Sequence, residues 1–152
     1  MISIILAASD DAEALARLLA ALVPGAAEGL VREVAVVGAR GAAAEVAEEA
    51  GAGLYAAFGD AFERARGPWV GGLPLSAGLA PGWMELVGDH LRRGQGPAWL
   101  VGRSFGISPR AGWLIPKRLA PSAVVVEQDL QRLARGGRRL RILDRDRAGR
   151  RR

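Results

Sequence analysis

The sequence predicts a single α/β domain built in three layers, with helices on both faces of a mostly parallel central sheet. Short apolar segments alternate with amphipathic helical segments through the first half of the chain, an order that is typical of right-handed βαβ units. The 152 residues, 50% of them hydrophobic, suffice for one core but not for two comfortable domains. We expect one domain over residues 1–143 and a basic, frayed tail over residues 144–152.

The first strand and helix are the most clearly marked elements. Residues 2–8 are apolar and rich in β-branched side chains, which is typical of a buried strand. Asp10 and Glu13 then resemble a capping box at the start of a helix. Leucines follow at the spacing of one helix face, and we expect Pro24-Gly25 to end this helix.

The strand-and-helix unit repeats farther along the chain. We expect strands at residues 34–37, 54–57 and 69–73, and helices at residues 42–50, 59–66 and 81–93. The second half is less regular, with strands expected at residues 98–101, 113–115, 124–126 and 140–143 and a helix at residues 127–135. His90 is expected at the surface near a helix end. The tryptophans are interpreted as core or interface anchors, with a sugar-stacking role for one of them left open.

The composition excludes several kinds of chemistry. The chain has no cysteine and a single histidine, so disulfides, thiolate zinc sites, cysteine nucleophiles and multi-histidine metal sites are excluded. No apolar run is long enough to span a bilayer, and residues 2–8 lack the basic start and cleavage region of a signal peptide. We therefore expect a cytoplasmic protein without a cofactor.

Positive charge is concentrated near the carboxyl end of the chain. The formal net charge is +5, and half of the arginines lie between Arg132 and Arg152. Such a segment is either a solvated tail or a surface that attracts a phosphate ligand or an anionic membrane. Nucleic acid is an unlikely partner, because no aromatic side chain interleaves the arginines as it does in single-strand binders.

The order of these segments resembles that of the bacterial family 2 glycosyltransferases, in the form of the small single-domain members. The resemblance covers most of the chain and is carried by residues 2–6, 12–22, 33–37, 44–52, 65–70, 79–83 and 127–133. It implies a Rossmann-like GT-A domain in which a nucleotide-sugar donor sits over the parallel sheet. The acidic start of the helix at residue 127 matches the segment that supplies the family's general base, so the resemblance implies Glu127 or Asp129 as catalytic residues.

The departures from the family pattern fall where its chemistry takes place. By spacing from Trp69 and Trp83, the family's metal-binding Asp-x-Asp motif falls on Pro74 and Ser76, and neither can replace a carboxylate at a hard-cation site. We therefore expect no metal site. The acidic turn that holds the nucleotide after the second strand is replaced by a turn around Arg40.

The resemblance and the strand ends together indicate a set of nucleotide-binding candidates: Ala8, Asp10, Gly38, Arg40 and Ser76. Gly38 and Arg40 belong to a G-x-x-G turn before a helix, which either binds phosphate through its backbone N–H groups or is a plain tight turn. Asp10 either contacts the nucleotide or caps its helix. Glu127 and Asp129 are either a general base or a solvated acidic helix start.

The functional hypothesis is a glycosyltransferase-like protein whose sugar transfer from a nucleotide donor is weak or lost, that is, a pseudoenzyme. If the protein is active, the reaction is an inverting transfer in which Arg40 or Arg103 does the work of the missing metal. The alternatives are a non-catalytic binding or scaffolding protein that keeps the fold, and a basic domain that binds anionic surfaces.

Overall fold

The computed structural model describes residues 1–94, 96–102, 111–120 and 126–145, with nothing stated for the side chains of Ala77 and Arg145. It contains a single eight-stranded sheet with the strand order β3-β2-β1-β4-β7-β6-β8-β5. The strands are β1 (Ile2–Ala7), β2 (Val31–Val37), β3 (Gly53–Tyr55), β4 (Trp69–Gly72), β5 (Ala77–Leu79), β6 (Ala98–Gly102), β7 (Gly112–Pro116) and β8 (Arg138–Arg145). The helices are α1 (Ala12–Ala27), α2 (Ala42–Glu49), α3 (Phe58–Arg64), α4 (Trp83–Arg92) and α5 (Glu127–Arg135), with a short 3₁₀ turn over Lys117–Leu119.

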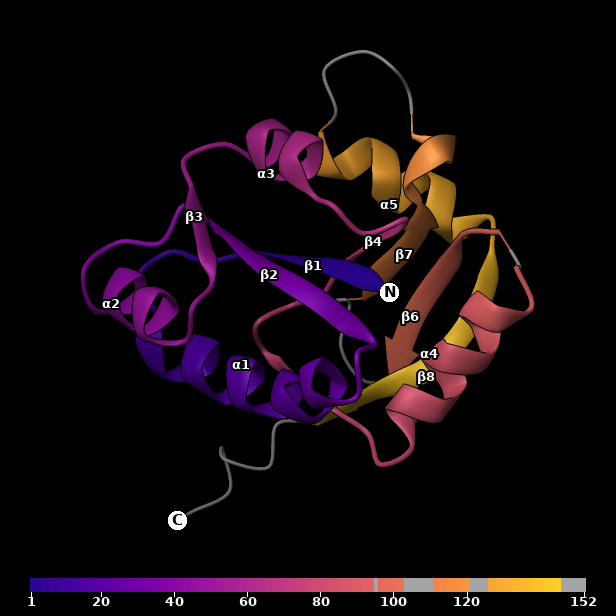
Figure 1. Ribbon diagram of the computed structural model, residues 1–152, viewed down its shortest axis with the longest axis horizontal. Coiled ribbons are helices and arrows are strands. Elements are labelled where there is room, and N and C mark those ends of the chain that lie inside the picture. Colours follow the sequence, from indigo (N-terminus) through magenta and orange to yellow (C-terminus); the bar gives the residue numbers. More distant parts are fainter. Residues whose placement is uncertain (95, 103–110, 121–125, 146–152) are drawn as a thin grey trace.

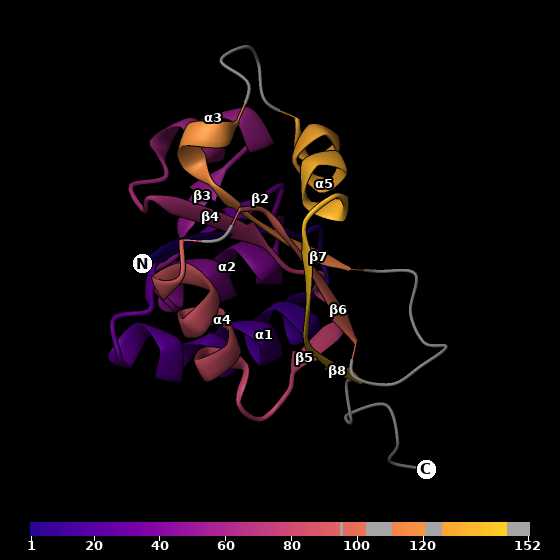
Figure 2. The ribbon, with the colours of Figure 1, turned by 90° about the vertical axis from the view of Figure 1, so that its right-hand side faces the viewer.

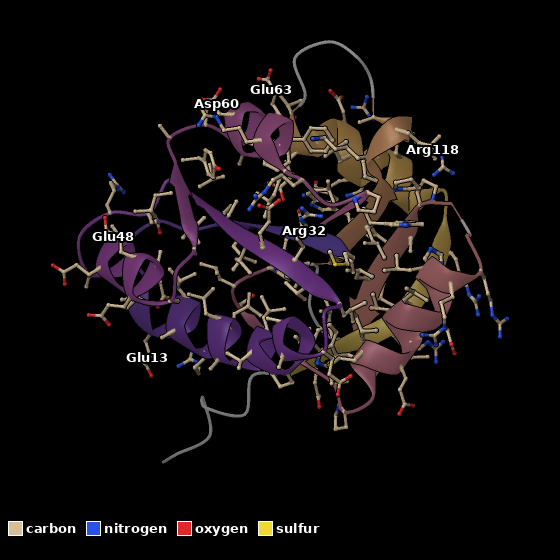
Figure 3. All side chains as sticks on the ribbon, viewed as in Figure 1. Glu13, Arg32, Glu48, Asp60, Glu63 and Arg118 are labelled. Carbon is tan, nitrogen blue, oxygen red and sulfur yellow. The ribbon has the colours of Figure 1, made fainter. Side chains whose placement is uncertain are left out.

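Helices cover both faces of the sheet, which confirms the predicted three layers. Helices α1, α2 and α4 lie on one side, and α3 and α5 lie on the other (Figures 1 and 2). Each side has its own core: leucines of α1 pack under the first face, and Phe62 of α3 with Leu130 of α5 packs under the second. Charged side chains such as Glu13, Glu48 and Asp60 point away from the sheet (Figure 3).

The predicted parallel sheet is only half correct. Strand β1 pairs in parallel with both β2 and β4, and β2 pairs in parallel with β3, as the alternating pattern predicts. However, β7 is antiparallel to β4 and β6, and β5 is antiparallel to β8, so the sheet is mixed. Only residues 103–111 connect β6 to β7. A parallel crossover needs about a dozen residues or more, so this connection favours an antiparallel pair.

Helix α1 runs through the proline that was expected to end it. Pro24 lies inside the helix, which continues to Ala27. The proline removes one backbone hydrogen bond near the end of the helix, where that loss is easiest to tolerate. Gly25 in the same turn packs closely against Trp83, since a Cβ on Gly25 would lie 2.7 Å from the Trp83 ring. The chain leaves the helix at Gly29, whose φ of 77° suits glycine.

Two other expectations differ from the structure. The last strand begins at Arg138 and continues to Arg145, beyond the expected residues 140–143. His90 is 1% exposed rather than at the surface. Its Nε2 lies 2.8 Å from the Gly96 carbonyl oxygen, and its ring packs edge-on against Trp69 with the centroids 5.6 Å apart. The strand expected at residues 124–126 and the tail beyond residue 145 lie outside the described residues.

Candidate functional site

A cleft with a volume of about 710 Å³ opens where β1 and β4 end. It is bordered by the end of β1 and the start of α1, by residues 72–76 at the end of β4, by β6 and β7, and by one face of α5. Because β1 and β4 are adjacent and parallel, their carboxyl ends meet at the same edge of the sheet. Ligands of open α/β sheets bind beyond this edge. The cleft is therefore the candidate functional site.

Glu127 stands in this cleft at the first residue of α5, and a tryptophan holds its carboxylate. Trp113 Nε1–H donates a hydrogen bond to Glu127 Oε1 at 3.1 Å. The Trp113 side chain is 1% exposed and lies over Gly72 of the neighbouring strand, where a Cβ would come within 2.3 Å of Nε1. The missing side chain at Gly72 thus makes room for the indole that orients Glu127.

A second tryptophan and an arginine form another part of the cleft wall. Trp99 of β6 is the register partner of Trp113, so the two indoles share one face of the sheet. The Arg135 guanidinium carbon lies 5.2 Å from the Trp99 ring centroid, in the geometry of a cation–π contact. Gln131, one turn earlier on α5, also borders the cleft. Polar, aromatic and charged groups therefore converge on the same space.

The end of β1 supplies backbone and a helix cap. Ala8 lines the cleft, and its N–H is bonded to the Val37 carbonyl oxygen at 2.9 Å. Asp11, and not Asp10, caps α1, because its Oδ1 accepts a hydrogen bond from the Ala14 N–H at 3.0 Å. Asp10 is exposed and accepts a hydrogen bond from the Ser9 hydroxyl at 3.3 Å.

The G-x-x-G turn lies beside the end of β1, but its first N–H groups are already used. The Gly38 N–H donates to the Tyr55 carbonyl oxygen at 2.9 Å, and the Arg40 N–H donates to the Ser9 carbonyl oxygen at 2.8 Å. Gly38 has a φ of 74°, which a tight turn requires and which favours glycine. These contacts favour the tight-turn interpretation. The exposed Arg40 side chain does not line the cleft.

The residues at the Asp-x-Asp positions do not fit a divalent metal ion. Pro74 and Ser76 line the cleft between β4 and β5, where they offer at most one hydroxyl and backbone carbonyls. The carboxylates that line the cleft are Asp11 and Glu127, and each already accepts a hydrogen bond from a protein group. Across the described ranges, no three Asp, Glu or His side chains gather in a way that could hold a metal ion.

The structure brings some of the candidates together and leaves others apart. Ala8, Ser76 and Glu127 line the cleft. The candidates that do not line it are Asp10, Gly38, Arg40 and Asp129. Asp129 lies 3.9 Å from Arg132, its ion-pair partner on the same helix. Of the two acidic residues proposed as the base, only Glu127 therefore has access to the cleft, while Arg103 lies outside the described residues.

Sequence reasoning missed a binding role for Gln131 and Arg135, and it left a sugar-stacking role open for one of the four tryptophans without selecting Trp99 or Trp113. A signal for two of them was present, because Gln131 and Arg135 follow Glu127 at intervals of one helical turn and so share its face. The tryptophans gave no such signal, since their side-by-side position depends on how β6 pairs with β7. The register between two strands cannot be obtained from the periodicity within each strand.

A second polar cluster lies away from the cleft, where Glu33 of β2 meets Ser3 of β1 and the segment after α3. Its carboxylate accepts hydrogen bonds from the Ser3 hydroxyl at 2.7 Å, the Arg66 N–H and the Arg66 side chain. Burial acts to raise the pKa of Glu33, but these hydrogen bonds and the Arg66 charge outweigh it, so the pKa is lowered. Gly67 N–H also donates to Ser3 Oγ at 2.8 Å. This cluster joins β1, β2 and the segment after α3, and it borders a separate cavity of about 270 Å³.

Solved structures resemble this chain in fold. A crystal structure of S. aureus TarS superposes with a TM-score of 0.66 at 12% sequence identity, and the match covers 95% of this chain and 60% of that one. Glucosyl-3-phosphoglycerate synthase from Mycobacterium tuberculosis, in complex with Mn2+, UDP and glucosyl-3-phosphoglycerate, gives a TM-score of 0.64 at 16% identity, covering 96% of this chain and 72% of that one. In a second complex of this synthase, with Mn2+, UDP and phosphoglyceric acid, the covered shares are 78% and 56% at 15% identity and a TM-score of 0.58.

These neighbours define the class of fold, which is that of the GT-A glycosyltransferases. At this level of identity the likeness concerns the fold alone, and the chain spans between 56% and 72% of the length of these structures. No protein-family model matches the sequence. No curated protein matches it either. Within the described residues, no helix combines the length and apolar character needed to cross a membrane.

Proposed function

We propose that the protein binds a nucleotide-sugar donor in the cleft at the ends of β1 and β4, and that its glycosyl transfer is weak or lost. The position of the cleft supports the binding site, because open α/β sheets receive nucleotides at this edge. Structural neighbours bind UDP or UDP-glucose together with Mn2+. The second half of the proposal rests on Pro74 and Ser76, which line the cleft at the positions where the family resemblance places the metal-binding Asp-x-Asp motif.

In this proposal the residues of the cleft have distinct roles. Ala8 and Ser76 border the donor with backbone and hydroxyl groups, while Asp10, Gly38 and Arg40 lie outside the lining and keep at most a peripheral role. Glu127 is the candidate general base. Its carboxylate would take the proton of an acceptor hydroxyl, which would attack the anomeric carbon with inversion. Trp113 orients that carboxylate through its 3.1 Å hydrogen bond.

Because the cleft does not fit a divalent ion, donor binding should be independent of metal. We expect calorimetry of UDP or UDP-glucose to give the same dissociation constant in manganese, in magnesium and in a chelator. UDP serves as the test ligand because it carries the diphosphate that a metal would bridge. Binding that strengthens clearly on addition of manganese would contradict the proposal, and would place a carboxylate other than Asp11 and Glu127 in the site.

Donor turnover should be negligible. Loss of one electrostatic stabiliser of a transition state typically costs about 3 kcal/mol, a hundredfold or more in rate, and losing the metal should cost at least that. A single general base increases the rate about 10²–10⁴-fold. This gain cannot offset the loss of the metal together with the loss of the acidic turn that holds the nucleotide in the family.

The measurement is sugar-nucleotide consumption across a panel of donors, for the wild type, for Glu127→Gln and for Asp129→Asn. The Asp129 variant is the matched control, because its carboxylate lies on the same helix but outside the cleft lining. We expect no turnover above background in any of the three, with donor binding retained. Robust turnover that disappears in Glu127→Gln but survives in Asp129→Asn would refute the loss of activity and identify Glu127 as the base.

A further inference from the structure

The last residue of α5 that borders the cleft is Arg135. Its guanidinium is held against an aromatic ring, and none of the described carboxylates forms an ion pair with it. Glu127, Gln131 and Arg135 all border the cleft from one face of the helix. The Arg135 guanidinium is stacked over the Trp99 ring at 5.2 Å. Stacking restrains the plane of the guanidinium while leaving its N–H groups available in that plane.

The charges around Arg135 favour an external anion. In the described part of the chain, no carboxylate forms an ion pair with Arg135, whereas Arg132 on the same helix lies 3.9 Å from Asp129. Trp99 is also the register partner of Arg139 on β8, and Arg139 is exposed. Register partners project from the same face of a sheet. A second cation therefore lies on the same side of the sheet as the Trp99–Arg135 pair.

We propose that Arg135, stacked on Trp99 and assisted by Gln131, binds a phosphate group of the ligand that occupies the cleft; this rests on the proposed function. A planar guanidinium matches phosphate oxygens with two parallel hydrogen bonds, and its restrained orientation lowers the entropy lost on binding. Arg139 does not line the cleft, but its positive charge on the same face of the sheet favours a doubly charged phosphate over a singly charged carboxylate at Arg135. Arg135 lies two helical turns from Glu127, about 12 Å along the axis. Glu127 and Arg135 therefore lie at opposite ends of one helix face that borders the cleft.

The test compares Arg135→Gln with the matched control Arg132→Gln in the full chain. The ligands are inorganic phosphate, glucose 6-phosphate, glucose and UDP, titrated by calorimetry at low and at high salt. Tryptophan fluorescence gives a second signal, because the ligand approaches the arginine that covers Trp99. Charge-assisted hydrogen bonds predict that Arg135→Gln weakens binding of the phosphate-bearing ligand about tenfold or more. Arg132→Gln should bind as the wild type does, and glucose should not respond to either change.

The pattern across ligands identifies the source of the phosphate. If Arg135→Gln weakens glucose 6-phosphate but not UDP, the phosphate belongs to the acceptor; if it weakens UDP, the phosphate belongs to the donor. Either result supports the inference. Equal effects of the two arginine variants, or glucose binding as tightly as glucose 6-phosphate, would overturn it. If the wild type binds UDP but Arg135→Gln changes the binding of no phosphate ligand, the inference is overturned and the proposed function stands. If the wild type binds inorganic phosphate or glucose 6-phosphate but not UDP, the proposed function alone is overturned. No binding of any ligand would overturn both.

Discussion

Replacing Gly72 by alanine tests whether the cleft depends on the contact between β4 and the Trp113 indole. The new methyl group would lie 2.3 Å from Nε1 and 2.4 Å from Cε2 of a ring that is 1% exposed. Overpacking of this kind costs about 1–3 kcal/mol. Displacement of the ring also breaks the hydrogen bond to the Glu127 carboxylate, which is worth about 1.5–3 kcal/mol. Replacing a strand glycine by alanine returns about 0.5–1 kcal/mol, so we expect Gly72→Ala to lower the free energy of unfolding by about 2–5 kcal/mol.

Gly71→Ala is the matched control, since it introduces the same methyl group one residue earlier on the opposite face. There the nearest atoms lie at 3.3 Å, and one of them is the end of the flexible Ile4 side chain. The gain of about 0.5–1 kcal/mol from replacing a strand glycine offsets this mild crowding, so the change should be within about 1 kcal/mol.

The assay is urea unfolding followed by far-ultraviolet circular dichroism. In a Trp113→Phe background the cost of Gly72→Ala should fall, because the smaller phenyl ring gives the methyl group room. Equal unfolding midpoints for Gly71→Ala and Gly72→Ala would refute the reasoning.

Two other side chains give predictions outside the cleft. The folded-state pKa of Glu33 is lowered by Arg66 and Ser3 against the effect of burial. Glu33 therefore contributes stability that is present above its unfolded pKa of about 4.3 and is lost as the pH falls through the folded value. The unfolding free energies of the wild type and Glu33→Gln should converge on acidification, and a gap independent of pH would contradict this. His90→Ala should lower the unfolding free energy by about 2–4 kcal/mol, because the side chain is buried and bonded to Gly96. Arg93→Ala, exposed at the end of the same helix, should change it by less than about 0.5 kcal/mol, and equal effects would contradict the structural role of His90.

The parallel half of the sheet was predictable because the sequence signals for its strands and helices lie within short, consecutive segments of the chain. The apolar segments that form β1, β2 and β3 are each followed by a helix that leads to the next strand, and this order predicts that β1 to β4 are parallel. The antiparallel half depends on the pairing of β4 with β7 and of β8 with β5, which involves residues far apart in the chain. Periodicity within a segment contains no information about its partner, so these two pairings could not be predicted.

The site was predictable to the extent that it follows strand ends. Ala8 comes directly after β1 and Ser76 lies in the segment that follows β4, whereas Glu127, the first residue of α5, was selected through the family resemblance. Asp10 and Asp129 were selected on the same grounds but do not line the cleft, because neighbouring residues differ in the direction of their side chains. Trp99 and Trp113 needed the strand register, and His90 was misplaced because its contacts with Trp69 and Gly96 are not encoded in helix periodicity.

The position of β8 has a consequence for the order in which the cleft can form during folding. Strand β5 is held in the sheet by β8, the last strand along the chain, and the cleft segment 72–76 leads directly into β5. Strands β1, β2 and β3 can pair early, since β1 with β2 and β2 with β3 are consecutive strands of the chain. The cleft border at Ser76 stays unanchored until residues 138–145 dock beside β6, a slow, long-range closure. Ligand-binding competence should therefore appear only in the final kinetic phase of refolding, after most of the secondary structure is already present.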